Sequence, residues 1–239
     1  MSDFTYVGSE LDLFAAVHHW KSYWSSAIRS FVTGDVLEAG AGIGSNTAYL
    51  DNGHLKRFVC MEPDRRLIDE LKKELRGKPR DYETVCGTLE TVGAAEQFDT
   101  IVYIDVLEHI ENDRAELERA SAHLRPGGRI VVLSPAHQWL FTPFDAAIGH
   151  FRRYTRPMLR AISPPGVEME ACFYLDSVGL LASAANLLFL KQSMPSKQQL
   201  HFWDTYIVPI SRVVDLCSRR CMGKSVVAVW RRNSIQRPT

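Results

Sequence analysis

The feature that most constrains this chain is an apolar strand that runs into three glycines at alternate positions. Residues 36–39 are predicted to form a buried strand, and Gly40, Gly42 and Gly44 follow it. Glycine has no Cβ and tolerates positive φ, so such a loop lets the backbone approach a ligand closely. The spacing is G-x-G-x-G, whereas the dinucleotide fingerprint G-x-G-x-x-G would put its third position at Ser45. The loop therefore predicts a nucleoside site without a seat for a pyrophosphate.

Hydrophobic periodicity predicts strands that alternate with helices after this loop. The predicted strands cover residues 57–61, 84–86, 98–104 and 129–133, and the predicted helices cover residues 45–50, 65–75 and 112–124. Strands separated by helices form βαβ units, so the fold class is α/β with a parallel sheet.

The flanking segments differ from this alternation. A helix is predicted over residues 9–32, where Leu11, Phe14, Val17, Trp20, Trp24 and Ile28 recur at helical spacing. Residues 135–154 are predicted to form a long aromatic-rich loop, followed by a short helix at 155–162. Two further strands are predicted at 169–174 and 225–230, with a helical insertion at about 178–220 between them, and the tail after Arg232 is expected to be disordered.

Composition bounds the classes of function. Lys+Arg and Asp+Glu each count 28 among 239 residues, which argues against a general nucleic-acid binder. The five cysteines have no framework spacing, which indicates a reducing compartment. The N-terminus lacks the pattern of a signal peptide and the longest apolar segment, 178–190, is too short to span a bilayer, so we expect a cytoplasmic protein.

A second motif directly follows the predicted strand 98–104. Residues 105–110 read D-V-L-E-H-I, and Pro126-Gly127-Gly128 precedes the next strand. With V-L-E-A-G-A-G-I-G at 36–44, these motifs resemble the class I S-adenosylmethionine (SAM)-dependent methyltransferases of the small-molecule branch, over most of residues 36–134. The resemblance implies a Rossmann-like sheet of seven strands with the last one antiparallel, helices on both faces, SAM as cofactor and a small-molecule acceptor.

The cofactor residues are predicted from both the pattern and the resemblance. Glu62 ends the second strand, where an acid can accept hydrogen bonds from ribose hydroxyls, although a surface carboxylate is the alternative. The resemblance implies that the Gly87–Leu89 loop holds the adenine and that Asp105 lies beside the methionyl end. The predicted cofactor-binding residues are Tyr23, Glu38, Ala39, Gly40, Gly42, Gly44, Glu62, Pro63, Gly87, Thr88, Leu89, Asp105 and Val106.

The acceptor side is predicted from residues 141–154, which resemble a G-H-x-R-R-Y segment of a bacterial subgroup of these enzymes. Phe144, His150, Arg153 and Tyr154 are predicted to bind the substrate. His109, His150 and Asp105 are the candidate catalytic groups, because a general base helps transfer to a hydroxyl. For the arginines, the alternative is pairing with Asp145 or helix acids; for His109 it is packing or helix capping. Glu108 is interpreted as a structural carboxylate, and no metal ligands are assigned.

We expect residues 1–34 to form a helical lid, 35–134 the SAM-binding core, and 135–239 the acceptor loop, the helical insertion and the closing hairpin of the same domain. The insertion could cap a lipophilic substrate, form a homodimer face or lie on a membrane surface. A nicotinamide-dependent oxidoreductase, a non-catalytic SAM-binding protein and an RNA or protein methyltransferase remain alternatives. The acceptor, the methylated atom and the oligomeric state stay open.

Overall fold

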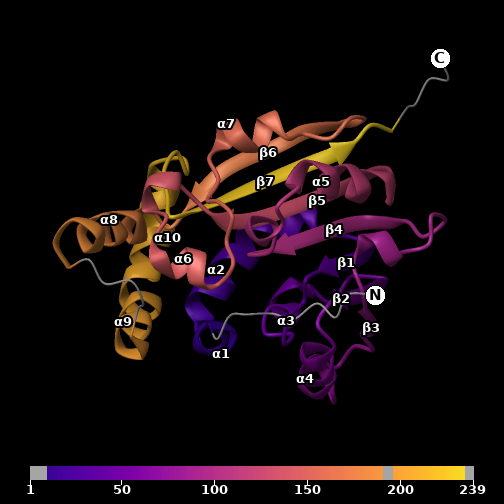
Figure 1. The fold of residues 1–239 in the computed structure, drawn as a ribbon, viewed down its shortest axis with the longest axis horizontal. Coiled ribbons are helices and arrows are strands. Elements are labelled where there is room, and N and C mark those ends of the chain that lie inside the picture. The colour runs from indigo at the N-terminus through magenta and orange to yellow at the C-terminus, as the bar shows by residue number, and fades with distance from the viewer. Residues whose placement is uncertain (1–9, 191–195, 235–239) are drawn as a thin grey trace.

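A computed structural model describes residues 10–190 and 196–234, and its centre is a single mixed sheet (Figure 1). The sheet has seven strands in the order β3-β2-β1-β4-β5-β7-β6. The first five are parallel, whereas β7 is antiparallel to both β5 and β6. The strands are β1 (Asp35–Ala39), β2 (Arg57–Glu62), β3 (Glu83–Cys86), β4 (Phe98–Ile104), β5 (Leu124–Pro135), β6 (Val167–Leu175) and β7 (Ser225–Arg232).

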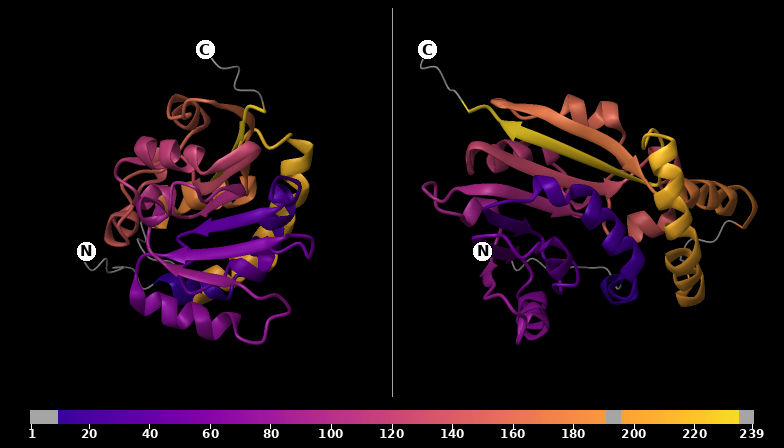
Figure 2. Two further views of the ribbon diagram at one scale, coloured as in Figure 1. Left: turned by 90° about the vertical axis from the view of Figure 1, so that its right-hand side faces the viewer. Right: turned by 180° about the vertical axis from the view of Figure 1, so that it is seen from behind.

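Helices lie on both faces of this sheet, and α8, α9 and α10 gather beyond the carboxyl ends of its parallel strands (Figures 1 and 2). The longer helices are α2 (His18–Ile28), α4 (Arg65–Leu75), α5 (Asp113–Ala122), α8 (Ser177–Ala185) and α10 (Val208–Cys217). Short helices are α1 (Glu10–Ala15), α3 (Thr47–Leu50), α6 (Pro143–Ala147), α7 (Arg156–Ala161) and α9 (Lys197–Phe202). Single turns are η1 (Arg29–Phe31), η2 (Leu89–Thr91), η3 (Leu107–His109) and η4 (Gln138–Leu140), and wider π-turns are η5 (Asn186–Leu190) and η6 (Trp203–Ile207).

Successive side chains of the strands alternate between two cores, as the period of a strand requires. Val36 of β1 packs in the core beneath α2, α4 and α10, together with Trp24 and Leu71. Leu37, the next residue, packs in the opposite core with Leu117 of α5. The middle of the sheet is thus buried on both faces, so polar side chains that reach solvent or a ligand are expected at the two ends of the strands.

The predicted α/β fold with an antiparallel last strand is confirmed, and residues 65–75 and 98–104 form a helix and a strand as predicted. Two predictions need correction. The N-terminal helix is interrupted between α1 and α2, and the segment 135–154 is not loop throughout, because it contains η4 and α6. Helix α6 begins at Pro143 behind a capping box formed by Thr142 and Asp145. The predicted disorder of the tail falls mainly on residues 235–239, outside the described residues.

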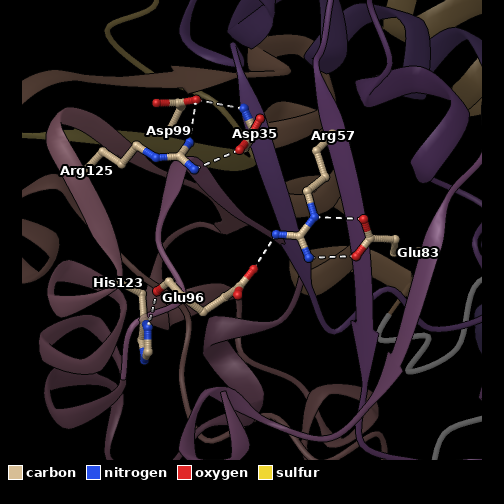
Figure 3. Close-up of polar contacts among 7 residues, drawn as sticks. All are labelled: Asp35, Arg57, Glu83, Glu96, Asp99, His123 and Arg125. Atoms are coloured by element: carbon tan, nitrogen blue, oxygen red, sulfur yellow. Dashed lines mark hydrogen bonds and ion pairs between the residues drawn. The ribbon is translucent and has the colours of Figure 1, made fainter. Parts of the chain in front are cut away.

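A network of ion pairs lies at the amino ends of the strands (Figure 3). Arg57 at the start of β2 binds Glu83 through two hydrogen bonds of 2.8 and 2.6 Å and also contacts Glu96. Arg125 at the start of β5 bridges Asp99 and Asp35 at 2.9 and 2.8 Å. These pairs tie neighbouring strands together at the edge opposite the glycine loop.

Within residues 10–190 and 196–234, the helices are too short or too polar for any of them to cross a lipid bilayer.

Candidate active site

A large cavity lies at the carboxyl ends of the parallel strands, with a volume of about 1370 Å³. Its wall includes the ends of β1, β2 and β4, the loops after them, helix α2 and the insertion formed by α8, α9 and η6. Pockets for one small ligand commonly measure ~300–1,000 Å³. This cavity therefore has room for two ligands side by side. Its position between β1 and β4 is the switch point of the sheet, where open α/β folds bind their ligands.

The glycine loop forms one wall of the cavity. Gly40, Gly42 and Gly44 all have positive φ, at 70°, 56° and 82°. A Cβ on Gly40 would meet Val106 at 2.7 Å, whereas one on Gly42 would meet Leu11 only at 3.7 Å. Gly40 is thus required for packing, and Gly42 is the position that leaves space on the cavity side. An added Cβ on Gly44 would approach Leu71 to 2.7 Å, and Gly44 is not among the residues that line the cavity, which favours a packing role for this glycine.

Glu62 ends β2 at the floor of the cavity. Its Oε2 accepts a hydrogen bond from the Gly42 amide and its Oε1 accepts one from the Asp64 amide, both at 2.9 Å. Burial raises the pKa of Glu62. Each carboxylate oxygen can accept a second hydrogen bond, so the fixed side chain is placed to bind hydroxyls of a ligand. Pro63 and the Gly87–Leu89 loop line the wall beside it, as does Ala39 at the end of β1.

Three predicted site residues lie away from the cavity wall. Glu38 is buried beneath the glycine loop and accepts a hydrogen bond of 2.6 Å from the Thr47 hydroxyl. The hydroxyl of Tyr23 donates to Asp215 of α10 at 2.6 Å, and that of Tyr154 donates to Asp113 at 2.8 Å. Their polar groups are turned into the protein interior, which favours a supporting role for each of them over the predicted direct contact with a ligand.

Asp105 follows β4 and begins the D-V-L-E-H-I segment. Its φ is 54°, a left-handed conformation that residues other than glycine rarely adopt and that is concentrated at functional sites. The carboxylate is open to the cavity although protein surrounds it on most sides, and this burial raises its pKa to about 6. Val106 lies beside it on the same wall. Asp105 therefore lies beside the glycine loop, since Val106, the next residue, packs against Gly40.

Glu108, His109 and His150 meet at the next part of the wall. Glu108 and His109 belong to η3 directly after Asp105, and His150 follows α6. A backbone hydrogen bond of 2.8 Å from Phe151 to Glu108 joins the two segments, and one of 2.9 Å from His150 to Asp145 fixes the loop after α6. The rings of His109 and His150 contact edge to face, with centroids 4.5 Å apart. Burial, with His150 nearby, lowers the pKa of His109 to about 4, and burial raises that of Glu108 well above its usual range.

Asp145 holds the side chains of His150 and Arg153 in place. His150 Nδ1 lies 3.0 Å from its Oδ1, and Arg153 binds it through two hydrogen bonds of 2.8 and 3.0 Å. Although burial opposes the shift, these hydrogen bonds hold the pKa of Asp145 well below its usual range. Arg153 lines the cavity but is paired, as is Arg152 with Asp113. Both arginines thus form ion pairs with carboxylates of the protein, as the alternative interpretation of the sequence predicts.

The remaining wall includes residues that sequence reasoning did not select. Lys21 of α2 is buried, and its ammonium donates to the carbonyls of Ala15 and Ser45, both at 3.1 Å. Burial lowers its pKa to about 8. In the sequence, the signal that could have indicated Lys21 is its position as a charged residue between Trp20 and Trp24 in an apolar segment. Phe144, which is predicted to bind the substrate, lines the cavity, as do Leu200 and Trp203 of the insertion.

Comparisons with known proteins agree with this architecture. The family described as "Methyltransferase domain" matches residues 37–130. A ubiquinone biosynthesis O-methyltransferase from Bradyrhizobium sp. (strain ORS 278) is 37% identical over 59 residues, which are 25% of this chain and 22% of that protein. The chain thus matches about a fifth of this curated relative's length.

Two solved structures share the fold over nearly the whole chain. An S-adenosylmethionine-dependent methyltransferase from Clostridium acetobutylicum ATCC 824 has a TM-score of 0.59 at 11% identity, covering 94% of this chain and 95% of that one. The N-methyltransferase NodS from Bradyrhizobium japonicum WM9 has a TM-score of 0.55 at 16% identity, covering 94% and 99%. These likenesses show that the chain has the fold of these two methyltransferases, and residues 37–130 match the model of a methyltransferase domain.

Proposed function

We propose that this chain transfers a methyl group from SAM to a small-molecule acceptor by in-line displacement. The observation that carries the proposal is the single cavity that joins the glycine loop, Glu62 and the Gly87–Leu89 loop to a second, partly apolar half. The cofactor fits the first half because Gly42 leaves space at the wall and Glu62 presents a fixed carboxylate. SAM, when bound, supplies a methyl group that its sulfonium already activates.

The residues of the chain then have three tasks. The glycine loop and Glu62 hold the nucleoside, and the Gly87–Leu89 loop holds the base. The insertion and α2 cover the cavity and exclude water, which lets the site orient its two ligands; orientation can supply ~7–11 kcal/mol of the barrier reduction. A hydroxyl acceptor must also lose its proton, and Asp105, His109 and His150 lie on the wall where that proton would leave.

The acceptor that suits the second half is a largely apolar molecule with a polar reacting group. Phe144, Leu200 and Trp203 line this half, while its polar groups concentrate around Asp105 and His150. An oxygen acceptor is favoured by the similarity of 59 residues to a ubiquinone biosynthesis O-methyltransferase. Zero net charge supports an acceptor other than nucleic acid. A cytoplasmic location and a homodimer remain predictions from the sequence.

The first experiment is calorimetric titration of the purified protein with S-adenosylhomocysteine, with NADH titrated in parallel. We expect micromolar or tighter binding of S-adenosylhomocysteine and no heat from NADH. Binding of NADH alone would instead support an oxidoreductase.

The second experiment tests methyl transfer with methyl-labelled SAM and a panel of phenols, catechols and amines, followed by fractions of a cell extract. Binding of S-adenosylhomocysteine without transfer to any of these acceptors would favour a non-catalytic SAM-binding protein.

A further inference from the structure

Glu108, His109 and His150 place three side chains of metal-ligating types against one another. One candidate ligand atom from each lies within 4.8 Å of the other two. They come from η3 and from the loop after α6, so residues more than forty positions apart in the sequence converge here. All three line the same cavity, on the acceptor side of Asp105. The cluster therefore has an open side toward the space in which the acceptor is proposed to bind.

Glu108 has a buried carboxylate oxygen whose partner is not found among the described residues. The residue is fully buried, Oε2 accepts a hydrogen bond of 2.9 Å from the Ser134 hydroxyl, and Oε1 has no hydrogen-bond partner among the described residues. A buried carboxylate oxygen without a partner costs ~1–3 kcal/mol or more, so such an atom requires an explanation. The Nε2 atom of His150 lies 3.9 Å from this oxygen. That distance is too long for a hydrogen bond.

The same distance fits two ligands on opposite sides of one ion. Donor atoms bound at about 2.1 Å to a common ion can be up to about 4.2 Å apart. The 3.9 Å between Glu108 and His150 falls within this limit. Because all three atoms lie within 4.8 Å, the remaining separations would need to close by no more than roughly 0.6 Å. Side-chain rotation alone can provide a shift of that size.

Each of the three side chains is also held from behind, as metal ligands usually are. Asp145 contacts Nδ1 of His150 at 3.0 Å, which turns Nε2 toward Glu108. Ser134 holds the second oxygen of Glu108, and the backbone of Ile148 and Gly149 hydrogen-bonds the ring of His109. These contacts fix the orientation of the three side chains, whose candidate ligand atoms lie around a common point.

We propose that Glu108, His109 and His150 bind a divalent first-row transition-metal ion, with its open coordination positions toward the cavity. Two imidazoles and one carboxylate form a donor set that suits Zn²⁺, Fe²⁺ or Mn²⁺ better than the all-oxygen sets preferred by Mg²⁺ or Ca²⁺. A role for this ion in catalysis rests on the proposed methyl transfer. The ion would then bind a hydroxyl oxygen of the acceptor and lower the pKa of that hydroxyl.

The test titrates chelator-treated protein with Co²⁺ and records the visible absorption, with Zn²⁺ competition to measure affinity. We expect one equivalent to bind with a spectrum that lacks a thiolate charge-transfer band, because the exposed cysteines are not ligands. Glu108→Gln, which keeps the shape of the side chain and its contact with Ser134, and His150→Ala should each weaken binding at least 10-fold. His54→Ala, an exposed histidine in the loop before β2, should match the wild type.

Calorimetry with S-adenosylhomocysteine is run on every variant in the same buffers. Wild-type affinity in Glu108→Gln would show that the variant is folded and that its loss of Co²⁺ is local. Wild-type protein that binds no Co²⁺, or Co²⁺ binding that Glu108→Gln and His150→Ala leave unchanged, would overturn the metal site. Either result is distinct from failure of the proposed function, which would appear as absence of S-adenosylhomocysteine binding in the wild type.

Discussion

At the amino ends of the strands, the carboxylates of Asp35, Glu83 and Asp99 each lie against a guanidinium, as Figure 3 shows. At the carboxyl ends, Glu38 and Glu62 are held by hydroxyl and amide groups and Asp105 faces the cavity. The hydrogen bonds from Arg57 lower the pKa of Glu83, whereas burial raises that of Glu38 to about 7 and that of Asp105 to about 6.

The same residue types therefore serve two purposes in one sheet. Paired carboxylates at the amino ends of the strands tie adjacent strands together through arginine side chains. Glu38 and Glu62 at the carboxyl ends of the strands are buried at a cost in stability, and such perturbed groups concentrate at functional sites. The comparison predicts that substitutions at the carboxyl ends of the strands can change ligand binding, whereas those at the amino ends change stability without changing binding. It also predicts that the pH dependence of stability has opposite signs for Glu38 and Glu83.

The largest expected effect is on ligand binding, from Gly42→Asp. The new side chain would enter the cavity side of the glycine loop beside Glu62, whose Oε2 binds the Gly42 amide. We expect affinity for S-adenosylhomocysteine to fall at least 100-fold in calorimetry, because the substitution removes space and adds a second negative charge. Gly53→Asp is the matched control: Gly53 also has positive φ, at 78°, and a Cβ there would meet no described atom within 4 Å. Equal binding by both variants would contradict this placement of the cofactor.

The second effect is on the pH dependence of stability, from Glu38→Gln. The pKa of Glu38 is raised from 4.5 to about 7 by burial, so the folded state holds a proton that the unfolded state has lost between these values. The free energy of unfolding of the wild type should therefore fall as pH rises through this window, by on the order of 3 kcal/mol, with 1.4 kcal/mol for each unit of pKa shift. Urea unfolding at pH 5 and pH 8 should show that Glu38→Gln loses most of this decrease.

Glu83→Gln at the amino edge sharpens the contrast, because its pKa shift has the opposite sign. A carboxyl whose folded pKa is lowered stabilises the protein at neutral pH and loses that contribution as pH falls below its unfolded pKa. Glu83→Gln should thus destabilise the protein slightly at pH 7 and become neutral in acid. Parallel pH profiles for the Glu38 and Glu83 variants would show that the two edges do not differ in this way.

Lys21→Met tests the link between α2 and the glycine loop. The ammonium joins Ala15 at the end of α1 to Ser45 after the loop, through hydrogen bonds of 3.1 Å each. Methionine keeps much of the side-chain volume but cannot donate, so we expect the lid to be held less firmly and S-adenosylhomocysteine to bind about 10-fold more weakly, since a hydrogen bond to a charged group contributes ~1.5–3 kcal/mol. Lys56→Met, on the exposed loop before β2, is the control. Unchanged binding in Lys21→Met would argue against closure of the lid through this residue.

Local sequence patterns were sufficient to predict the helices and strands around the cavity, but not the side-chain contacts at the carboxyl ends of the strands. Residues 65–75 and 98–104 were predicted with their observed bounds because amphipathic and apolar runs are local signals. Tyr23 and Tyr154 were assigned to ligands, yet each hydroxyl found an acid far away in the sequence, Asp215 or Asp113. The contact of Glu108 with His150 likewise depends on a backbone hydrogen bond between two distant segments, which no spacing reveals.

The smallest effect is expected from Arg125→Gln at the amino edge. Arg125 bridges Asp35 and Asp99 at 2.8 and 2.9 Å, but its side chain is 38% exposed, so water compensates for part of the loss. Exposed ion pairs contribute ~0–1 kcal/mol each, and we expect about 1 kcal/mol of lost stability in urea unfolding, with less loss at high salt. Binding of S-adenosylhomocysteine should stay within twofold of the wild type, since β1 and β4 remain paired between this edge and the cavity. A larger loss of binding than of stability would show that the amino edge, too, shapes the site, because the two strands that flank the switch point would then respond as one unit.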